Sequence, residues 1–382
     1  MIVSALRTPL TRSRKGGLAD QPPSELLRVV LQATLQQTGV SGADIEDVCI
    51  GTVLTPPSHT GFLRMATIAA GIPETSSVQT VNRQCSSGLQ ACATIANAIR
   101  AGEITVGIGS GVECMSQFPM GAMKLPPNAA HWPTMQQHPA AMDCLLPMGI
   151  TSDTVVHTYG LQRSDLDAFA TRSHAKAAAA QAAGKFQHET VPVGNVTHDD
   201  GIRPQTTPAI LSRLRPVFSP TGATTAGNSS QTTDGAAAVL LMTRREARRR
   251  GLAVQAVWRG FAVAGVPPKV MGIGPAVAIP KVLAQVGIQL DAVDVFEINE
   301  AFASQALWCV RELGIDESKV NPSGGAIALG HPLGATGARM MATLVQEMKR
   351  RKGSRYGVIS MCVGTGMGAA AVVEMETPQA AL

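Results

Sequence analysis

The chain has 382 residues, of which 45% are hydrophobic, 15% charged and only 3% aromatic. A net charge of +5 with so few aromatic side chains argues against nucleic-acid binding, which uses basic residues interleaved with stacking rings. The length predicts two or three packed units, or one fold with an inserted region. Cores of Ala, Val, Ile, Leu and Met, with 38 glycines, are typical of an α/β protein.

The seven cysteines form an odd set without a Cys-x-x-Cys pair, which argues against a disulfide framework and a structural zinc site. We identify no apolar run of the ~18 residues that a membrane span needs, and no signal-like N-terminal stretch. The last residues, Gln-Ala-Ala-Leu, are not a Ser-Lys-Leu address. We therefore expect a reducing compartment, no metal ion and no membrane insertion.

The first predicted elements are a turn and buried strand over Asp44–Gly51, a helix after Cys85, and a strand over Val106–Gly111. Apolar side chains recur on one face of the helix at Leu89, Cys92, Ala93, Ala96 and Ile99. Cys85 stands where helix N–H groups stabilise a thiolate. Taken alone, it is equally well interpreted as a small buried hydrophobe.

Residues 115–231 interrupt this pattern with prolines and methionines and indicate an inserted, loop-rich region. Its one clear helix is expected to begin at Ser164, with Asp167 as the partner of a capping box, and to end at Gly184. The strand Gly235–Leu241 then returns the chain to a core.

The second half repeats the order of the first. Asp291–Ile298 again predicts a turn and strand, a helix follows His331, and Gly357–Gly364 is an apolar strand that ends in glycine. This helix has Met341, Leu344, Val345 and Met348 on one face. The two halves therefore indicate a duplicated β/α unit, whose equivalent loops bring Cys85 and His331 together.

Three further residues are candidates for chemistry. His331, between glycine-rich turns, is suited to accept a thiol proton or to donate to an oxyanion. Asn299 follows the repeated strand and is suited to hold a water molecule. Cys362 is an acid/base candidate or a core residue. Gly364–Ala369 loosely matches a dinucleotide loop, but a strand and not a helix follows it, so we reject that interpretation.

Four segments resemble the catalytic loops of the thiolase family, in family order and across essentially the whole chain: Cys85–Ala91, Asn299–Phe302, Gly330–Pro332 and Cys362–Gly364. The residues after Cys85, and Pro147–Ser152, resemble the degradative, peroxisomal 3-ketoacyl-CoA type. The alternatives are a biosynthetic acetoacetyl-CoA thiolase and a catalytically silent CoA-binding protein of the same fold. A ketoacyl synthase usually has histidine where Cys362 stands.

The resemblance implies a five-layered α-β-α-β-α fold made of two duplicated β/α domains with an inserted loop domain. The expected boundaries are 1–114 plus 232–250 for the N-terminal domain, 115–231 for the loop domain with its CoA contacts, and 251–382 for the C-terminal domain. It also implies a homodimer, with a tetramer as the alternative. The implied location is peroxisomal, with cytoplasmic or mitochondrial location as alternatives.

For the chemistry, the resemblance implies that Cys85 carries the acyl group and His331 helps to ionise it. Cys362 exchanges protons with the acetyl-CoA enolate and with CoA, which is a substrate, so no cofactor is expected. One oxyanion site is implied at His331 and an Asn299-bound water, and another at the N–H groups of Cys85 and Gly364.

Three residues of the chain resemble family positions that contact CoA or the acyl group: Arg203, Ser230 and Met271. A surface arginine and a core methionine are the alternatives for the first and the last. Between Pro192 and Gly201 the chain is shorter than expected for the peroxisomal type, which leaves contacts at that edge of the loop domain open.

Overall fold

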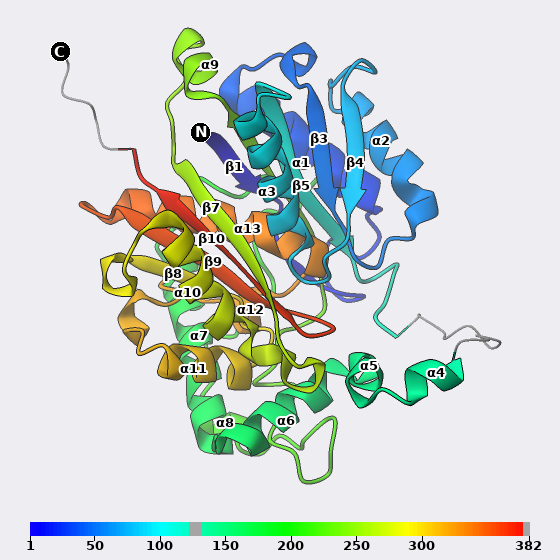
Figure 1. The fold of residues 1–382 in the computed structure, drawn as a ribbon, viewed down its shortest axis with the longest axis vertical. Helices are drawn as coiled ribbons and strands as arrows, with labels where there is room; N and C mark the ends of the chain where they lie inside the picture. The colour runs from blue at the N-terminus through cyan, green and yellow to red at the C-terminus, as the bar shows by residue number, and fades with distance from the viewer. Residues whose placement is uncertain (122–131, 377–382) are drawn as a thin grey trace.

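The computed structural model describes residues 1–121 and 132–376, and its strands form two mixed sheets (Figure 1). The first sheet has the order β1-β6-β5-β3-β4, with β2 beside β6. Its strands are β1 (Ile2–Arg7), β2 (Thr11–Arg12), β3 (Asp47–Gly51), β4 (Ser77–Val81), β5 (Val106–Cys114) and β6 (Thr233–Met242). The second sheet has the order β7-β10-β9-β8. Its strands are β7 (Val257–Gly265), β8 (Val295–Ile298), β9 (Tyr356–Val363) and β10 (Met367–Glu374).

The two sheets confirm the duplication that the sequence predicts. In the first sheet, β5 is parallel to β3 and antiparallel to β6, which is antiparallel to β1. In the second, β9 is parallel to β8 and antiparallel to β10, which is antiparallel to β7. The four strands predicted in the repeat, and the one that returns from the insertion, all form where expected.

Helices form three layers around the sheets, which confirms the five-layered expectation (Figure 1). Between the sheets lie α3 (Ser87–Ala101) and α13 (Leu333–Arg350), whose apolar side chains share one core with both sheets. Outside the first sheet lie α1 (Pro23–Thr38) and α2 (Thr60–Ala69). Outside the second lie α10 (Gly274–Val286) and α11 (Ala303–Glu312).

The remaining helices are short, except for two in the insertion. They are α4 (Trp132–Gln136), α5 (Pro139–Met142), α6 (Met148–Tyr159), α7 (Arg163–Ala182), α8 (Pro208–Leu211), α9 (Arg244–Arg249) and α12 (Ala326–Leu329). The 3₁₀ turns in the described part of the chain are η1 (Gly42–Asp44), η2 (Pro57–His59), η3 (Asp143–Leu145), η4 (Pro268–Ile273), η5 (Leu290–Ala292) and η6 (Glu317–Lys319).

The prediction of a single clear helix in the insertion is wrong, because α6 is also well formed. The predicted capping box is absent as well, since the N-cap of α7 is Gln162 and makes no side-chain hydrogen bond. The Asp167 carboxylate instead accepts hydrogen bonds from Arg163 and Asn228. A tertiary contact across the insertion has thus replaced a local one.

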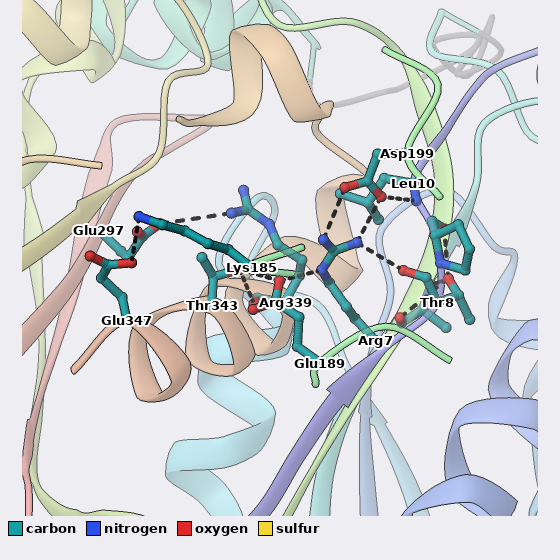
Figure 2. Close-up of polar contacts among 12 residues, drawn as sticks. Arg7, Thr8, Leu10, Lys185, Glu189, Asp199, Glu297, Arg339, Thr343 and Glu347 are labelled. Carbon is teal, nitrogen blue, oxygen red and sulfur yellow. Dashed lines mark hydrogen bonds and ion pairs between the residues drawn. The ribbon is translucent and has the colours of Figure 1, made fainter. Parts of the chain in front are cut away.

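The sequence predicts that α13 buries one apolar face. In the structure, every residue from Leu333 to Met348 is buried between the sheets. Its polar side chains therefore need buried partners, and Figure 2 shows them. Thr343 Oγ1 donates to Glu189 at 3.0 Å, and Glu189 also pairs with Arg7 at 2.7 Å. Arg339 lies 3.8 Å from the Glu297 carboxylate. This polar row ties α13 to β1, β8 and the insertion.

One stretch, Pro268–Val286, is long and apolar enough to cross a membrane by length and composition, contrary to the expectation that no such run exists. Half of it is buried within the protein. Ile279 and Val282 pack in one core with Val372 of β10. The run therefore serves as the helix layer on the outer face of the second sheet.

Candidate active site

Cys85 lies in a tight turn between β4 and α3, directly before the N-cap residue Ser86. Gln84 adopts a left-handed conformation, φ 46°, that non-glycine residues rarely take. The Ser87 hydroxyl fixes the turn, since it accepts from Arg83 N at 2.9 Å and donates to Gln84 O at 2.6 Å. The turn holds Cys85 at the start of a central helix, as the sequence predicts.

His331 is held by two hydrogen bonds from its backbone and one from its ring. Its N–H donates to Gln231 O and Thr233 Oγ1, each at 3.2 Å, and its Nδ1 lies 2.7 Å from Thr336 Oγ1. The Asn299 amide nitrogen lies 3.4 Å from His331 Nε2. Because that amide nitrogen can only donate, Nε2 is the acceptor, and Nδ1–H donates to Thr336. His331 therefore presents an unprotonated ring nitrogen beside Asn299.

Asn299 follows β8, and its backbone N–H donates to Ser360 O of β9 at 2.9 Å. The side chain is 1% exposed, and its Oδ1 has no hydrogen-bond partner among the described residues. Buried amide oxygens are normally satisfied, by protein groups or by ordered water. The amide can thus donate to His331 with one end and accept from a water or a substrate with the other.

Cys362 ends β9 and packs in a small apolar cluster with Met271, Phe302 and Met148. The chain then turns back through Gly364 into the antiparallel strand β10, which confirms that this glycine-rich segment is a hairpin and not a dinucleotide loop. A Cβ on Gly364 would lie 3.7 Å from the Gln84 side chain. The Cys362 hairpin therefore meets the turn that carries Cys85.

Burial favours the uncharged forms of three candidate side chains at this site, Cys85, His331 and Cys362. Burial raises the pKa of the Cys85 thiol to about 11, although the N–H groups of Gly364 and Cys85 favour the thiolate. Burial, and then the charge of Arg339, lower the pKa of His331 to about 3. Burial and the neighbouring Cys85 raise the pKa of Cys362 well above its usual range. The Cys85 thiol therefore needs a nearby base in order to ionise.

The three residues assigned to CoA and acyl contacts lie in different surroundings. Met271 is 2% exposed and packs with Cys362. Ser230 N donates to Ala301 O at 2.9 Å, which places it at the edge of the same cluster. Arg203 is exposed, and its backbone N–H donates to His174 Nδ1 at 3.2 Å. The structure thus brings the first two to the reactive residues and shows Arg203 at the surface of the insertion.

The sequence interpretation missed four residues that shape this site: Gln84, Glu113, Thr233 and Thr336. Glu113 carries a visible signal, since it is the one charged residue in the apolar strand β5. The strain at Gln84 and the two threonine contacts with His331 leave no sequence signal, because each depends on a three-dimensional arrangement.

The sequence matches the description "Thiolase, N-terminal domain" over residues 1–245 and "Thiolase, C-terminal domain" over residues 252–375. It is 52% identical to 3-ketoacyl-CoA thiolase 2, peroxisomal, of Arabidopsis thaliana, over 98% of this chain and 83% of the relative. It is 49% identical to 3-ketoacyl-CoA thiolase, peroxisomal, of Homo sapiens, over 98% of this chain and 90% of the relative.

Solved structures agree with these sequence relatives. The dimeric peroxisomal thiolase of Saccharomyces cerevisiae superposes with a TM-score of 0.93 at 42% identity, covering 98% of this chain and 97% of that one. The acetyl-CoA acetyltransferase of Bacillus anthracis gives 0.88 at 36% identity, covering 98% of both chains. Together with the duplicated fold, these matches show that the chain belongs to the thiolase family.

Proposed function

We propose that the chain is a degradative 3-ketoacyl-CoA thiolase, an acyltransferase that cleaves its substrate with CoA through an acyl group on Cys85. The products are acetyl-CoA and an acyl-CoA shortened by two carbons. The observation that carries this proposal is the acceptor Nε2 of neutral His331, fixed beside the buried Asn299 amide. Relatives named as peroxisomal 3-ketoacyl-CoA thiolases, at 49% and 52% identity, support the degradative direction and a peroxisomal location.

The first half-reaction begins with proton transfer from the Cys85 thiol to His331 Nε2. The thiolate then attacks the 3-keto carbon, and the charge moves to the keto oxygen. The protonated Nε2, with a water held by Asn299, donates to that oxyanion. The bond between carbons 2 and 3 breaks, which leaves an acyl-Cys85 thioester and the enolate of acetyl-CoA.

Cys362 completes the exchange of protons. Its thiol is neutral, because burial and Cys85 raise its pKa, so it can donate a proton to the enolate carbon and release acetyl-CoA. The Cys362 thiolate then takes the proton of the incoming CoA thiol. The CoA thiolate attacks the acyl-Cys85 carbonyl, whose oxyanion accepts from the N–H groups of Cys85 and Gly364. The intermediate then breaks its bond to Cys85 and releases the shortened acyl-CoA, and the Cys85 thiolate takes back its proton from His331.

The inserted segment, 115–231, is our proposed CoA-binding domain, between an N-terminal domain of 1–114 plus 232–250 and a C-terminal domain of 251–382. Two observations support the assignment: Ser230 borders the cluster around Cys362, and Arg203 presents an exposed guanidinium suited to a phosphate. Met271, also in that cluster, is proposed to contact the acyl group. CoA is a substrate here, and the scheme requires no cofactor.

A homodimer is the proposed assembly, as the yeast relative is a dimeric thiolase. β4 pairs on one side only, with β3, and so leaves a sheet edge unpaired. Exposed strand edges are normally covered. Phe62, Met65 and Ile68 add an exposed apolar face on the neighbouring helix α2.

A second candidate is the biosynthetic acetoacetyl-CoA thiolase, which shares the fold, as the match to an acetyl-CoA acetyltransferase indicates. Rates with 3-ketoacyl-CoA substrates of four to sixteen carbons separate the two. Degradative function predicts turnover of the longer chains, whereas activity confined to four carbons would favour the biosynthetic enzyme.

The Cys85→Ser variant tests the proposed nucleophile. It is expected to lose thiolysis and to gain no acyl group, observed by mass spectrometry after brief exposure to 3-ketoacyl-CoA, because a serine hydroxyl is a far weaker nucleophile at this pH. Cys92→Ser is the matched control, since Cys92 lies on the same helix but in the core. Full activity in Cys85→Ser would overturn the proposal.

A further inference from the structure

Glu113, at the end of β5, is a fully buried carboxylate with no basic partner within salt-bridge distance among the described residues. Its Oε2 accepts from the N–H groups of Gly334 at 2.9 Å and Val53 at 3.0 Å. Its Oε1 accepts from Leu54 N at 3.0 Å, and the Thr52 hydroxyl donates to it at 3.4 Å. One side chain thus joins β5, the loop after β3 and the first turn of α13.

Burial of a carboxylate without a cation opposes folding. Burial also raises the pKa of Glu113 to about 7, although backbone N–H groups of Gly334 and of the loop after β3 counteract it. An apolar side chain would fill the same space at lower cost. We therefore expect that Glu113 is useful because its carboxylate connects backbone N–H groups from separate parts of the chain, those of Gly334, Val53 and Leu54.

Those donors lie where the two central helices touch. Gly334 is three residues after His331, in the first turn of α13. A Cβ on Gly88, in the first turn of the Cys85 helix, would lie 2.6 Å from Gly334 O. A Cβ on Gly111 of β5 would lie 2.2 Å from the same oxygen. The backbones are in direct contact here, so the bond from Gly334 to Glu113 fixes how the His331 loop sits on the half that carries Cys85.

We propose that Glu113 is a positioning residue for acyl transfer, whose carboxylate anchors the His331 loop to the Cys85 half of the molecule through Gly334. The proposal rests on the function proposed above. A displacement of about 1 Å between reacting groups lowers a rate by about 10²-fold, so loss of the anchor is expected to slow acylation by that order.

Two conservative variants separate the anchor from the charge. In Glu113→Gln, the amide oxygen can still accept from Gly334 and Val53, whereas its nitrogen can donate to Thr52 but can no longer accept from Leu54. The bond to Gly334 therefore stays, while the charge and the bond from Leu54 are lost. In Glu113→Asp, the charge stays, but the side chain is about 1.5 Å shorter and cannot reach Gly334 and the loop together. Glu46 supplies the control, since it accepts from Thr105 N at 2.7 Å and Val106 N at 3.1 Å, at the opposite end of the same strands.

The experiment measures single-turnover acylation of Cys85 by acetoacetyl-CoA with mass spectrometry, in proteins shown to be folded by thermal melting. Glu113→Gln is expected within about 5-fold of the wild-type rate, and Glu113→Asp about 10²-fold slower. Glu46→Asp is expected to match wild type.

Wild-type acylation in folded Glu113→Asp, or a slower rate in Glu113→Gln than in Glu113→Asp, would overturn the anchor. If Glu113→Asp does not fold, Glu113→Gln decides alone: a loss larger than about 5-fold contradicts the proposal. Failure of wild type to form acyl-Cys85 would instead overturn the proposed function.

Discussion

At the scale of single residues, the site depends on groups that burial keeps neutral. A neutral thiol at Cys85 is a poor nucleophile, and the neutral imidazole at His331 offers an unprotonated nitrogen whose lowered pKa makes it a weak base in the substrate-free site. Asn299 sets the ring nitrogen that accepts, and Thr336 holds the opposite nitrogen. The chemistry therefore follows from the pairing of these side chains.

His331 gives the protein a specific pH dependence of stability. The pKa of its imidazole falls from 6.5 to about 3 in the fold, so below pH 6.5 the unfolded chain takes up a proton that the folded chain does not. Stability is therefore lost as pH falls from 6.5 toward 3. His331→Gln is expected to reduce the pH slope of the unfolding free energy in this range by up to about 1.4 kcal/mol per pH unit.

Urea unfolding at several pH values between 6.5 and 4.5 measures this slope. His188→Gln is the matched control, because it removes an exposed histidine without touching the core. Equal slopes in wild type and His331→Gln would contradict the buried, neutral state of His331.

At the scale of elements, the contact between α3 and α13 sets the active-site geometry. Glycines allow the two helices to approach each other and the ends of β3 and β5 more closely than any side chain permits. The polar row of α13 then fixes the rest of the helix against the insertion and β8. The position of α13 is thus set by glycine contacts in its first turns and by polar contacts further along the helix.

Gly334→Ala tests this packing. The added Cβ would lie 2.6 Å from Thr52 Cα and 2.9 Å from both Glu113 Oε2 and Gly51 O, where backbone leaves little room to relax. We expect a loss of about 1–3 kcal/mol in stability, with slower acylation of Cys85. Gly265→Ala is the control, since nothing lies within 4 Å of its added Cβ. Denaturant unfolding of both variants measures this loss of stability. An unchanged unfolding midpoint in Gly334→Ala would contradict the close contact.

At the scale of the whole molecule, a duplicated unit has acquired different roles in its two halves. The first half supplies Cys85, and the second supplies Asn299, His331 and Cys362. The insertion between β5 and β6 lies beside the site through Ser230 and Met148. The edge strand β4 and the apolar face of α2 are the surfaces that we propose to contact a second copy.

The double variant Phe62→Asp with Met65→Asp tests that assembly. These side chains are 53% and 63% exposed, so in a monomer the change is expected to leave the core intact. If these side chains lie in a dimer interface, the double variant would bury two carboxylates there. Analytical ultracentrifugation is then expected to show monomers of the variant and dimers of the wild type. Val277→Asp, on α10 and 42% exposed, is the control. A double variant that stays dimeric would place the interface elsewhere.

The sequence by itself determined the duplication and the central strands of both repeats, and it singled out the loops that we propose to be reactive. These features depend on local order: alternating apolar runs, glycines at turns, and Cys85, His331 and Cys362 each within a short motif. It also predicted which face of the Cys85 helix packs inward. The family resemblance then supplied the five layers, which periodicity alone does not specify.

Only the tertiary structure decided what depends on burial and on contacts between distant residues. The capping box at Ser164 gave way to a contact between Asp167 and Asn228, and α13 is buried on all sides because a second sheet covers it. The neutral state of His331 and the anchor at Glu113 arise in the same way. A side chain's charge and hydrogen bonds are set by its neighbours in space, and those neighbours come from both halves of the chain.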